Sequence, residues 1–289
     1  DALSIYSSYA YVTRPLSDDV SYTLTATLSY GDKTCTKDFA VTVKAEGVND
    51  DKESVVDFGK LMDGIASTYT SSSDPWVVLE MAAYGASAAD STYASDKAVA
   101  LAGTDASKLA KYVLAELALG NDASDFITKL ESVDPAAAGI YTVPFVLSAL
   151  ERSNGSDTQI NACIDYLLAN AEANGGWGYG YGMATDATAM VIAGLAPYYS
   201  TNADVKAEVD KALTVLSAAQ GSDGTWDANS NSTAMVITAL SALNIDAHTD
   251  SRFIKNNKSA VEGLMSFALS SLDGFGYKGN VTKNAMATE

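Results

Sequence analysis

Residues 216–243, LSAAQGSDGTWDANSNSTAMVITALSAL, form one copy of a unit that recurs along the chain, and this unit decides the fold. When the sequence is slid against itself, Trp177 in NGGWGYGYGMATDATAMVIAGL falls on Trp226, and Phe275 in LDGFGYKGNVTKNAMATE falls on both. Each copy has an apolar helical segment, a Gly-rich turn that ends in an aromatic residue, and a second helical segment that opens with Ala, Thr and Met. The repeat therefore predicts a series of helical hairpins.

Segments of helical period also fill the rest of the chain after residue 53. Asp74 and Pro75 predict a clean helix start there, as N-cap and first helical residue. Segments with one polar stripe alternate with segments that are apolar nearly all round. The striped segments are 55–65, 109–119, 160–171, 205–219 and 260–272, and the apolar ones are 76–84, 141–150, 186–197 and 232–243. An apolar helix must be covered on all sides, so this pattern predicts an inner ring of helices inside an outer ring.

The predicted fold class is mainly α, an α/α toroid of about six helical hairpins with a small N-terminal β segment. We expect about eleven helices, with the last cut off after Glu289. In the β segment, residues 22–43 alternate with period two around the turn Tyr30-Gly31-Asp32-Lys33, which predicts a hairpin. With residues 12–15 it resembles the second half of a degenerate bacterial immunoglobulin-like module. The expected domains are residues 1–47, a linker at 48–53, and the toroid at 54–289.

The stretch Gln220-Gly-Ser-Asp-Gly-Thr-Trp226 resembles the Gln-x-x-Asp-Gly-x-Trp repeat signature of the terpenoid cyclase and protein prenyltransferase superfamily. The resemblance implies an α/α barrel. In physical terms the Gln can bond backbone groups of the next repeat, Asp-Gly makes a tight turn, and the aromatic residue fills the joint between hairpins. Trp177, Trp226 and Phe275 are therefore predicted to be core residues.

The catalytic groups of that superfamily have no counterpart in this chain. The sequence contains no Asp-x-Asp-Asp cluster and no Gly-Cys-Gly-Glu-Gln stretch, and His248 is its only histidine. Cys163 has no Asp two residues before it, so the zinc set of the prenyltransferases is missing. We therefore predict no catalytic residue, metal or cofactor. Asp227-x-Asn229-x-Asn231 has the spacing of a calcium loop but lacks its Gly and Glu, and an ordinary loop with Asn231 or Ser232 as N-cap is favoured.

Charge and hydropathy exclude two classes of partner. The formal net charge is -18, with no cluster of Lys and Arg, which argues against nucleic acid. No apolar run is long enough to span a membrane. The two cysteines, Cys35 and Cys163, fall in different predicted domains, so a structural disulfide is not expected.

Candidate ligand-binding residues lie in the turns and on the inner helices. Equivalent turns of a toroid share one rim, so we expect an aromatic and polar patch there, made by Tyr179, Tyr181, Asp227, Asn229 and Tyr277. Two further carboxylates are candidates at an inner helix: Asp186, which could simply cap its helix, and Glu80, which should be paired or face the central cavity.

These features favour a non-catalytic binding or scaffold module, extracellular or on the surface of a bacterial cell. Its partner is an unknown small molecule, glycan or protein, held at the rim or in the cavity. The alternatives are an enzyme on the same fold, either carboxylate-dependent and carbohydrate-active or a diverged terpenoid cyclase, and a cobalamin-type carrier. Two carboxylates in the cavity would favour an enzyme. A cavity filled by Met81, Met190 and Met235 would favour a scaffold.

Overall fold

The computed structural model describes residues 20–30, 33–43 and 58–288, and the chain divides into two compact units, Asp1–Val55 and Val56–Glu289. In the first unit, β1 (Val20–Tyr30) and β2 (Lys33–Val43) pair antiparallel, with Tyr30 opposite Lys33. The predicted hairpin is confirmed. Residues 31 and 32 of its turn, the segment 12–15 and the linker 48–53 lie outside the described residues.

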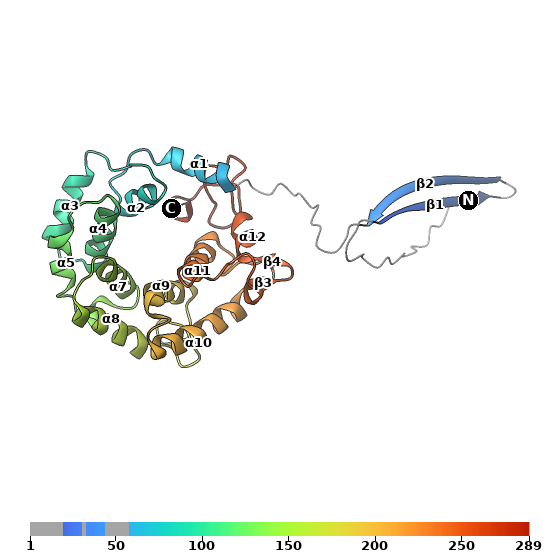
Figure 1. Cartoon of the computed structure of the whole chain (residues 1–289). Helices are drawn as coiled ribbons and strands as arrows, with labels where there is room; N and C mark the ends of the chain where they lie inside the picture. The colour runs from blue at the N-terminus through green and yellow to red at the C-terminus, as the bar shows by residue number, and fades with distance from the viewer. Residues whose placement is uncertain (1–19, 31–32, 44–57, 289) are drawn as a thin grey trace. The chain divides into compact units, whose positions relative to one another are not determined.

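The second unit is helical, and its helices form two concentric layers (Figure 1). The inner layer consists of α2 (Pro75–Ala83), α4 (Ala106–Ala118), α7 (Val143–Arg152), α9 (Thr185–Leu195), α11 (Ser230–Ala242) and the short α13 (Ala285–Thr288). The outer layer consists of α1 (Phe58–Thr68), α3 (Tyr93–Ala102), α5 (Ser124–Leu130), α8 (Asp157–Ala169), α10 (Ala203–Ala219) and α12 (Ala260–Met265). A short α6 (Pro135–Ala138) precedes α7, two 3-10 turns lie at Ala196–Tyr198 and Ser251–Phe253, and β3 (Ile254–Lys255) pairs with β4 (Lys258–Ser259).

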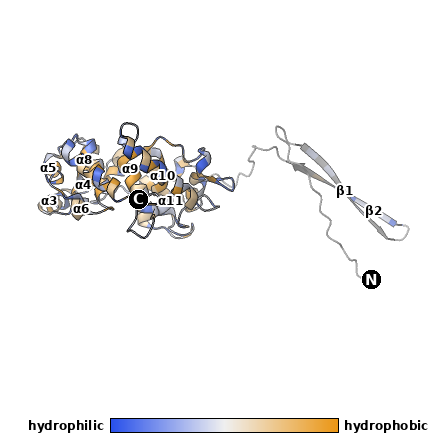
Figure 2. Cartoon of the chain, turned by 90° about the horizontal axis from the view of Figure 1, so that it is seen from below, coloured by the Kyte–Doolittle hydropathy of each residue, from blue (hydrophilic) through white to orange (hydrophobic). Residues whose placement is uncertain are grey.

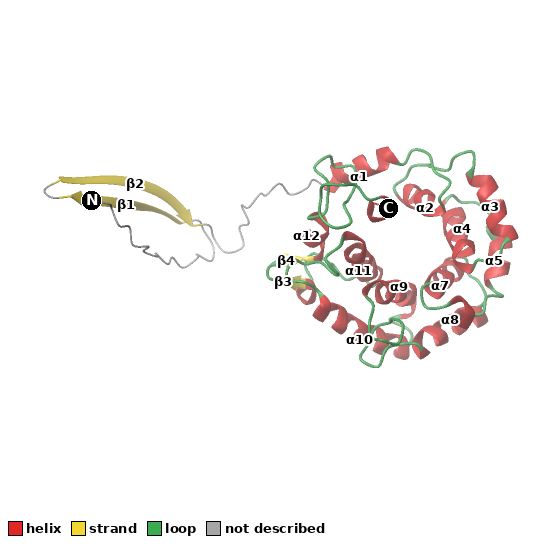
Figure 3. Ribbon diagram, turned by 180° about the vertical axis from the view of Figure 1, so that it is seen from behind, coloured by secondary structure: helices red, strands yellow, loops and turns green. Residues whose placement is uncertain are grey.

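Successive inner helices pack side by side, α2 on α4, α4 on α7, α7 on α9 and α9 on α11. An outer helix returns the chain between each of these pairs, as the view from behind also shows (Figure 3). Seen edge-on, the hydrophobic residues gather on the helices (Figure 2). The structure thus confirms a mainly helical chain with a small antiparallel sheet.

Helix α4 differs from its prediction. Its polar stripe predicted an outer helix, yet it lies in the inner layer between α2 and α7. Glu116 on that stripe is only 1% exposed, because Lys97 Nζ (2.6 Å) and the Tyr93 hydroxyl (2.9 Å), both on α3, bind its carboxylate. The charge is satisfied by a neighbouring helix instead of by solvent, so the stripe did not mark an outward face.

The joints between hairpins are made as predicted. Trp177 and Trp226 are fully buried, and each indole Nε1 donates to a carbonyl ten residues earlier, Leu167 O (2.7 Å) and Leu216 O (2.8 Å). Gln220 Nε2 donates to the Phe253 carbonyl (2.9 Å), which belongs to the next outer segment. The indole bonds tie both loops to the outer helix that precedes them, and the Gln220 bond also ties the loop 220–229 to the segment that follows.

Candidate functional site

The loops that lead from an outer to an inner helix all reach the same end of the helical unit, because each outer helix returns the chain before the next inner helix begins. We call this end the rim. Its loops are residues 69–74, 103–105, 131–142, 170–184, 220–229 and 270–284. Most of the predicted ligand-binding residues lie in these loops or just after them.

Tyr179 and Tyr181 are exposed on the rim. Their side chains are 70% and 98% exposed. The Tyr179 ring stacks on Tyr141, with ring centroids 5.2 Å apart and planes at 28°. The Gly180 N–H donates to Glu172 Oε1 (2.8 Å) and holds the loop between the two tyrosines. Burial, followed by the hydrogen bond with Tyr179, raises the pKa of the Tyr141 phenol to about 12, so this phenol is neutral at physiological pH.

Tyr277 occupies the same place in the loop 270–284, beside the start of α11. Its ring is 43% exposed, and Lys278 Nζ lies 5.7 Å from the ring centroid. The Ser230 N–H donates to the Tyr277 carbonyl (3.1 Å), and Ser230 Oγ donates to the Gly276 carbonyl (2.8 Å). These two bonds hold the backbone at Gly276 and Tyr277 against Ser230, the first residue of α11.

Asp227 and Asn229 have different surroundings and different roles. Asp227 is exposed, with a positive φ of 51°. Asn229 is only 3% exposed, and its Oδ1 accepts the Ser232 N–H (2.8 Å) as N-cap of α11. The prediction that Asn231 or Ser232 caps this helix was wrong, because the left-handed turn at Asp227 and Ala228 starts the helix earlier. Asn229 is committed to the helix, whereas Asp227 remains exposed in this loop together with Ser222 and Asp223.

Asp186 lies in the first turn of α9 and does not cap it. The N-cap position is Ala184, which makes no side-chain cap bond, so a capping role for Asp186 is wrong. Asp186 Oδ1 is buried and has no hydrogen-bond partner among the described residues. Its charge is the smallest of the contributions that raise the pKa of Tyr141.

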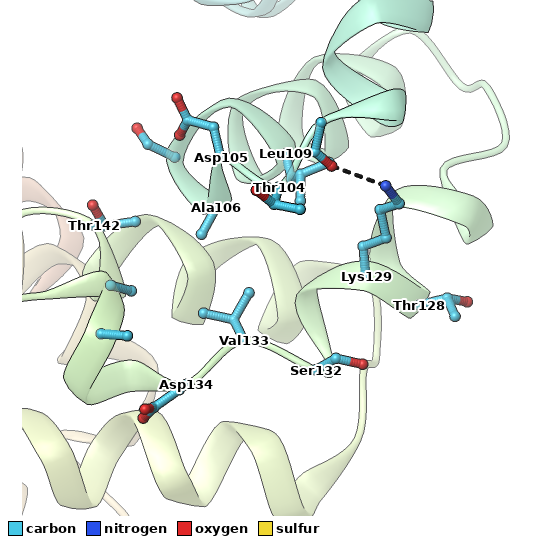
Figure 4. Close-up of a pocket in the computed structure, with 14 residues that line it drawn as sticks. Thr104, Asp105, Ala106, Leu109, Thr128, Lys129, Ser132, Val133, Asp134 and Thr142 are labelled. Atoms are coloured by element: carbon cyan, nitrogen blue, oxygen red, sulfur yellow. Dashed lines mark hydrogen bonds between the residues drawn. The ribbon is translucent and has the colours of Figure 1, made fainter.

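A groove of about 620 Å³ opens at the ends of α4 and α7 where these helices begin (Figure 4). Hydroxyl and carboxylate groups surround an apolar floor: Thr104, Asp105, Ser107, Thr128, Ser132, Asp134 and Thr142 around Leu109, Val133 and alanines. Lys129 Nζ closes one side by donating to the Gly103 carbonyl (2.9 Å). Thr142 lines the groove and directly follows Tyr141 in the chain, although Tyr141 and Tyr179 are not among the lining residues. We name this surface the rim groove.

The residues of the rim groove were missed by the sequence analysis. Their signal was weak, since the groove is built from two loops of the first half of the chain, where the repeat is not visible. The sequence pattern places Tyr141 at the start of an apolar helix, and nothing in its local sequence indicates that it meets Tyr179.

A second cavity of about 780 Å³ lies at the centre of the ring. Glu80 lines it, as expected, and is the single carboxylate among its described lining residues, whereas Asp186 and Tyr179 do not line it. The wall is otherwise mostly apolar and rich in methionine: Met62, Met81, Met190, Met235 and Met286. The second carboxylate that a glycosidase pair needs is not among the described residues of this wall.

Comparisons with protein-family models, with curated proteins and with solved structures found no match in any of the three. Within the described residues, no cluster of three or more His, Cys, Asp and Glu could hold a metal ion. No helix in this part of the chain has the length and apolar character needed to cross a membrane.

Proposed function

We propose that the chain is a non-catalytic binding module, extracellular or on a bacterial surface, whose helical unit is an α/α toroid of the terpenoid cyclase and protein prenyltransferase type. The concentric helix layers and the buried Gln-x-x-Asp-Gly-x-Trp joint support the toroid. The hairpin fits the proposed immunoglobulin-like spacer. The ligand is taken at the rim, where side chains are both anchored and exposed.

One observation carries the proposal: Tyr179 stacks on Tyr141, which directly precedes the groove residue Thr142 in the chain, and still leaves 70% of its own side chain exposed. A ring held in place before binding loses little side-chain entropy when a ligand arrives. Tyrosine offers an apolar face and a hydroxyl, and the groove adds five hydroxyl side chains and two carboxylates. Such groups suit a glycan, whose faces are apolar and whose edges are hydroxyls.

A glycan-cleaving enzyme is the second candidate, because Asp105 and Asp134 both line the groove. Each is already an N-cap: Asp105 Oδ1 accepts the Lys108 N–H (3.1 Å) and Asp134 Oδ1 accepts the Ala136 N–H (3.0 Å). Helix capping accounts for both carboxylates, which favours binding over hydrolysis. Asn caps a helix as well as Asp does, so Asp105→Asn and Asp134→Asn test catalysis without removing the caps.

The test begins with a printed array of bacterial and plant glycans probed with the labelled chain, followed by calorimetric titration of the best oligosaccharide. We expect Tyr179→Ala to weaken binding about tenfold, since one exposed ring contact contributes roughly 1–2 kcal/mol, and Tyr179→Phe to keep most of it. Val99→Ala, which removes a side chain 72% exposed on the outer helix α3, is the matched control and should change nothing. Binding that is indifferent to Tyr179 would refute the rim site, and product release that Asp105→Asn or Asp134→Asn abolishes would favour the enzyme.

A further inference from the structure

The two ends of the helical unit differ in charge. The rim loops together carry eight carboxylates and two lysines. The loops at the opposite end, residues 84–92, 119–123, 153–156, 196–202 and 243–259, carry four carboxylates against two lysines and one arginine. The rim therefore has a net excess of six negative charges, whereas the opposite end has an excess of one.

The two rim lysines neutralise little of this charge. Lys283 Nζ lies 3.5 Å from Asp273 Oδ2, and in the part of the chain that the structure describes no other ion pair includes a carboxylate of the rim loops. Lys278 Nζ lies over the Tyr277 ring, 5.7 Å from its centroid. The field of the rim carboxylates is thus left largely uncompensated by the chain, and such a field attracts ligands of positive charge.

Two of these carboxylates, Asp105 and Asp134, line the rim groove (Figure 4). Both are exposed, and the printed cap bond of each uses Oδ1 alone. Lys129 is the single basic residue among the described residues of this wall, and its Nζ donates to the Gly103 carbonyl (2.9 Å). The groove therefore already holds one ammonium group, and its carboxylates still outnumber its lysine.

Asp186 adds a further carboxylate directly after the rim loop 170–184. Its Oδ1 is buried and has no hydrogen-bond partner among the described residues. A buried carboxylate oxygen without a donor is unfavourable, and a nearby cation offsets that cost. After burial and the neighbouring Tyr179, the charge of Asp186 also raises the pKa of Tyr141. This unsatisfied carboxylate is an observation separate from the count of charges, and it favours the same kind of ligand.

The exposed tyrosine rings favour a cation as well. The face of an aromatic ring attracts an ammonium group through its quadrupole. The Tyr277 ring already has the ammonium of Lys278 beside it. The side chains of Tyr179 and Tyr181 remain 70% and 98% exposed, so ring surface is open to a ligand. An amine at the rim is attracted by rings and carboxylates together, whereas an anionic group is repelled by both.

We propose that the rim binds glycans whose sugars carry free amino groups, and that it discriminates against glycans that carry carboxylate or sulfate groups. The sugar face packs on Tyr179, the sugar hydroxyls bond the polar side chains of the groove, and the protonated amines lie near the rim carboxylates. This inference rests on the glycan-binding function proposed above and names the class of glycan.

The test compares two ligands that differ in one group. The whole chain is titrated in a calorimeter with a hexasaccharide of glucosamine and with the hexasaccharide of N-acetylglucosamine of the same linkage, at about pH 6, where amines are protonated and carboxylates are ionised. We expect the free-amine ligand to bind about tenfold more tightly, since two amine–carboxylate contacts of about threefold each give this ratio. Raising NaCl from about 0.05 M to about 0.5 M should remove most of the difference, because salt screens exposed charges.

Asparagine substitutions locate the charges responsible. Asp105→Asn and Asp227→Asn should each weaken binding of the glucosamine ligand about threefold and leave the acetylated ligand unchanged. Asn keeps the cap at position 105, and it tolerates the positive φ of 51° at position 227. Asp122→Asn is the matched control at the opposite end: Asp122 Oδ1 accepts the Ser124 N–H (2.9 Å), which Asn also allows. This variant should bind both ligands as the original chain does.

The outcomes separate this inference from the function on which it rests. Equal binding of the two hexasaccharides, both weakened by Tyr179→Ala, would overturn the inference and leave the rim glycan site standing. A glycan array without any bound glycan would overturn both. An oligolysine of the same charge that binds as tightly as the glucosamine ligand, with neither affected by Tyr179→Ala, would also overturn the inference, because charge alone would then account for binding.

Discussion

Replacing Thr233 by valine should test whether the joints between hairpins stabilise the helical unit. Thr233 is fully buried; its Oγ1 accepts the Trp226 N–H (3.1 Å) and donates to the Asn229 carbonyl (2.7 Å). Valine keeps the shape of threonine but offers no acceptor, so the buried N–H of Trp226 loses its partner. A buried donor without a partner costs about 1–3 kcal/mol. We expect the free energy of unfolding to fall by about 2 kcal/mol, and Tm by roughly 4–8 °C.

The assay is urea denaturation of the whole chain, followed by circular dichroism and by tryptophan fluorescence. Thr214→Val is the matched control, because Thr214 is exposed and its Oγ1 donates only to the Asp210 carbonyl of its own helix (3.0 Å). It should change the free energy of unfolding by about 0.5 kcal/mol or less. Thr188→Val, at the equivalent joint, should resemble Thr233→Val. Equal midpoints for Thr233→Val and Thr214→Val would show that the joint does not depend on this hydroxyl.

Three further substitutions or conditions probe other contacts. Gly224→Ala should lower Tm more than Gly180→Ala in a thermal scan: both glycines have positive φ, but a Cβ at 224 would lie 2.3 Å from a backbone carbonyl oxygen, whereas at 180 it meets nothing within 4 Å. Lys97→Met should lower the free energy of unfolding, measured in urea, by about 3 kcal/mol, because it removes the ion pair of the Glu116 carboxylate, which is only 1% exposed. Adding Glu116→Gln to this variant should restore much of the lost stability. Because the pKa of Tyr141 is raised to about 12, the stability that its neutral phenol contributes is complete below pH 10 and is lost as pH rises through 12. The Tyr141→Phe variant should therefore lose less stability at alkaline pH, as measured by circular dichroism against pH.

The sequence predicted best those features that a repeat makes visible. Trp177 and Trp226 are predicted core residues because they recur in register with a Gly-rich turn, and both are fully buried. The bond from Gln220 to the next outer segment was predicted from the same motif. A repeat makes the same contact in several copies, so the role of a residue in one copy predicts the role of the equivalent residue in the others.

Features that depend on neighbours distant in the sequence could not be predicted. The polar stripe of α4 indicated an outer helix, because nothing in its own sequence shows that Lys97 and Tyr93 reach Glu116 from α3. The stacking of Tyr141 on Tyr179 joins two loops separated by α7 and α8, and it depends on which loops are adjacent at the rim. The rim groove was missed for the same reason.

The residues that break the repeat are the ones that distinguish the rim loops from one another. The threonine of each joint is the same in three copies because the same N–H must be satisfied. Two residues after the aromatic of the joint, however, the copies carry Tyr179, Ala228 and Tyr277. This position is exposed in all three loops, although the Tyr179 ring also stacks on Tyr141 and Lys278 Nζ lies 5.7 Å from the Tyr277 ring centroid. Each exposed ring keeps apolar surface in water, at a cost that contact with a ligand at the rim would remove. The unequal distribution of tyrosine therefore favours a ligand that contacts the loops at 179 and 277 and does not contact the loop at 228.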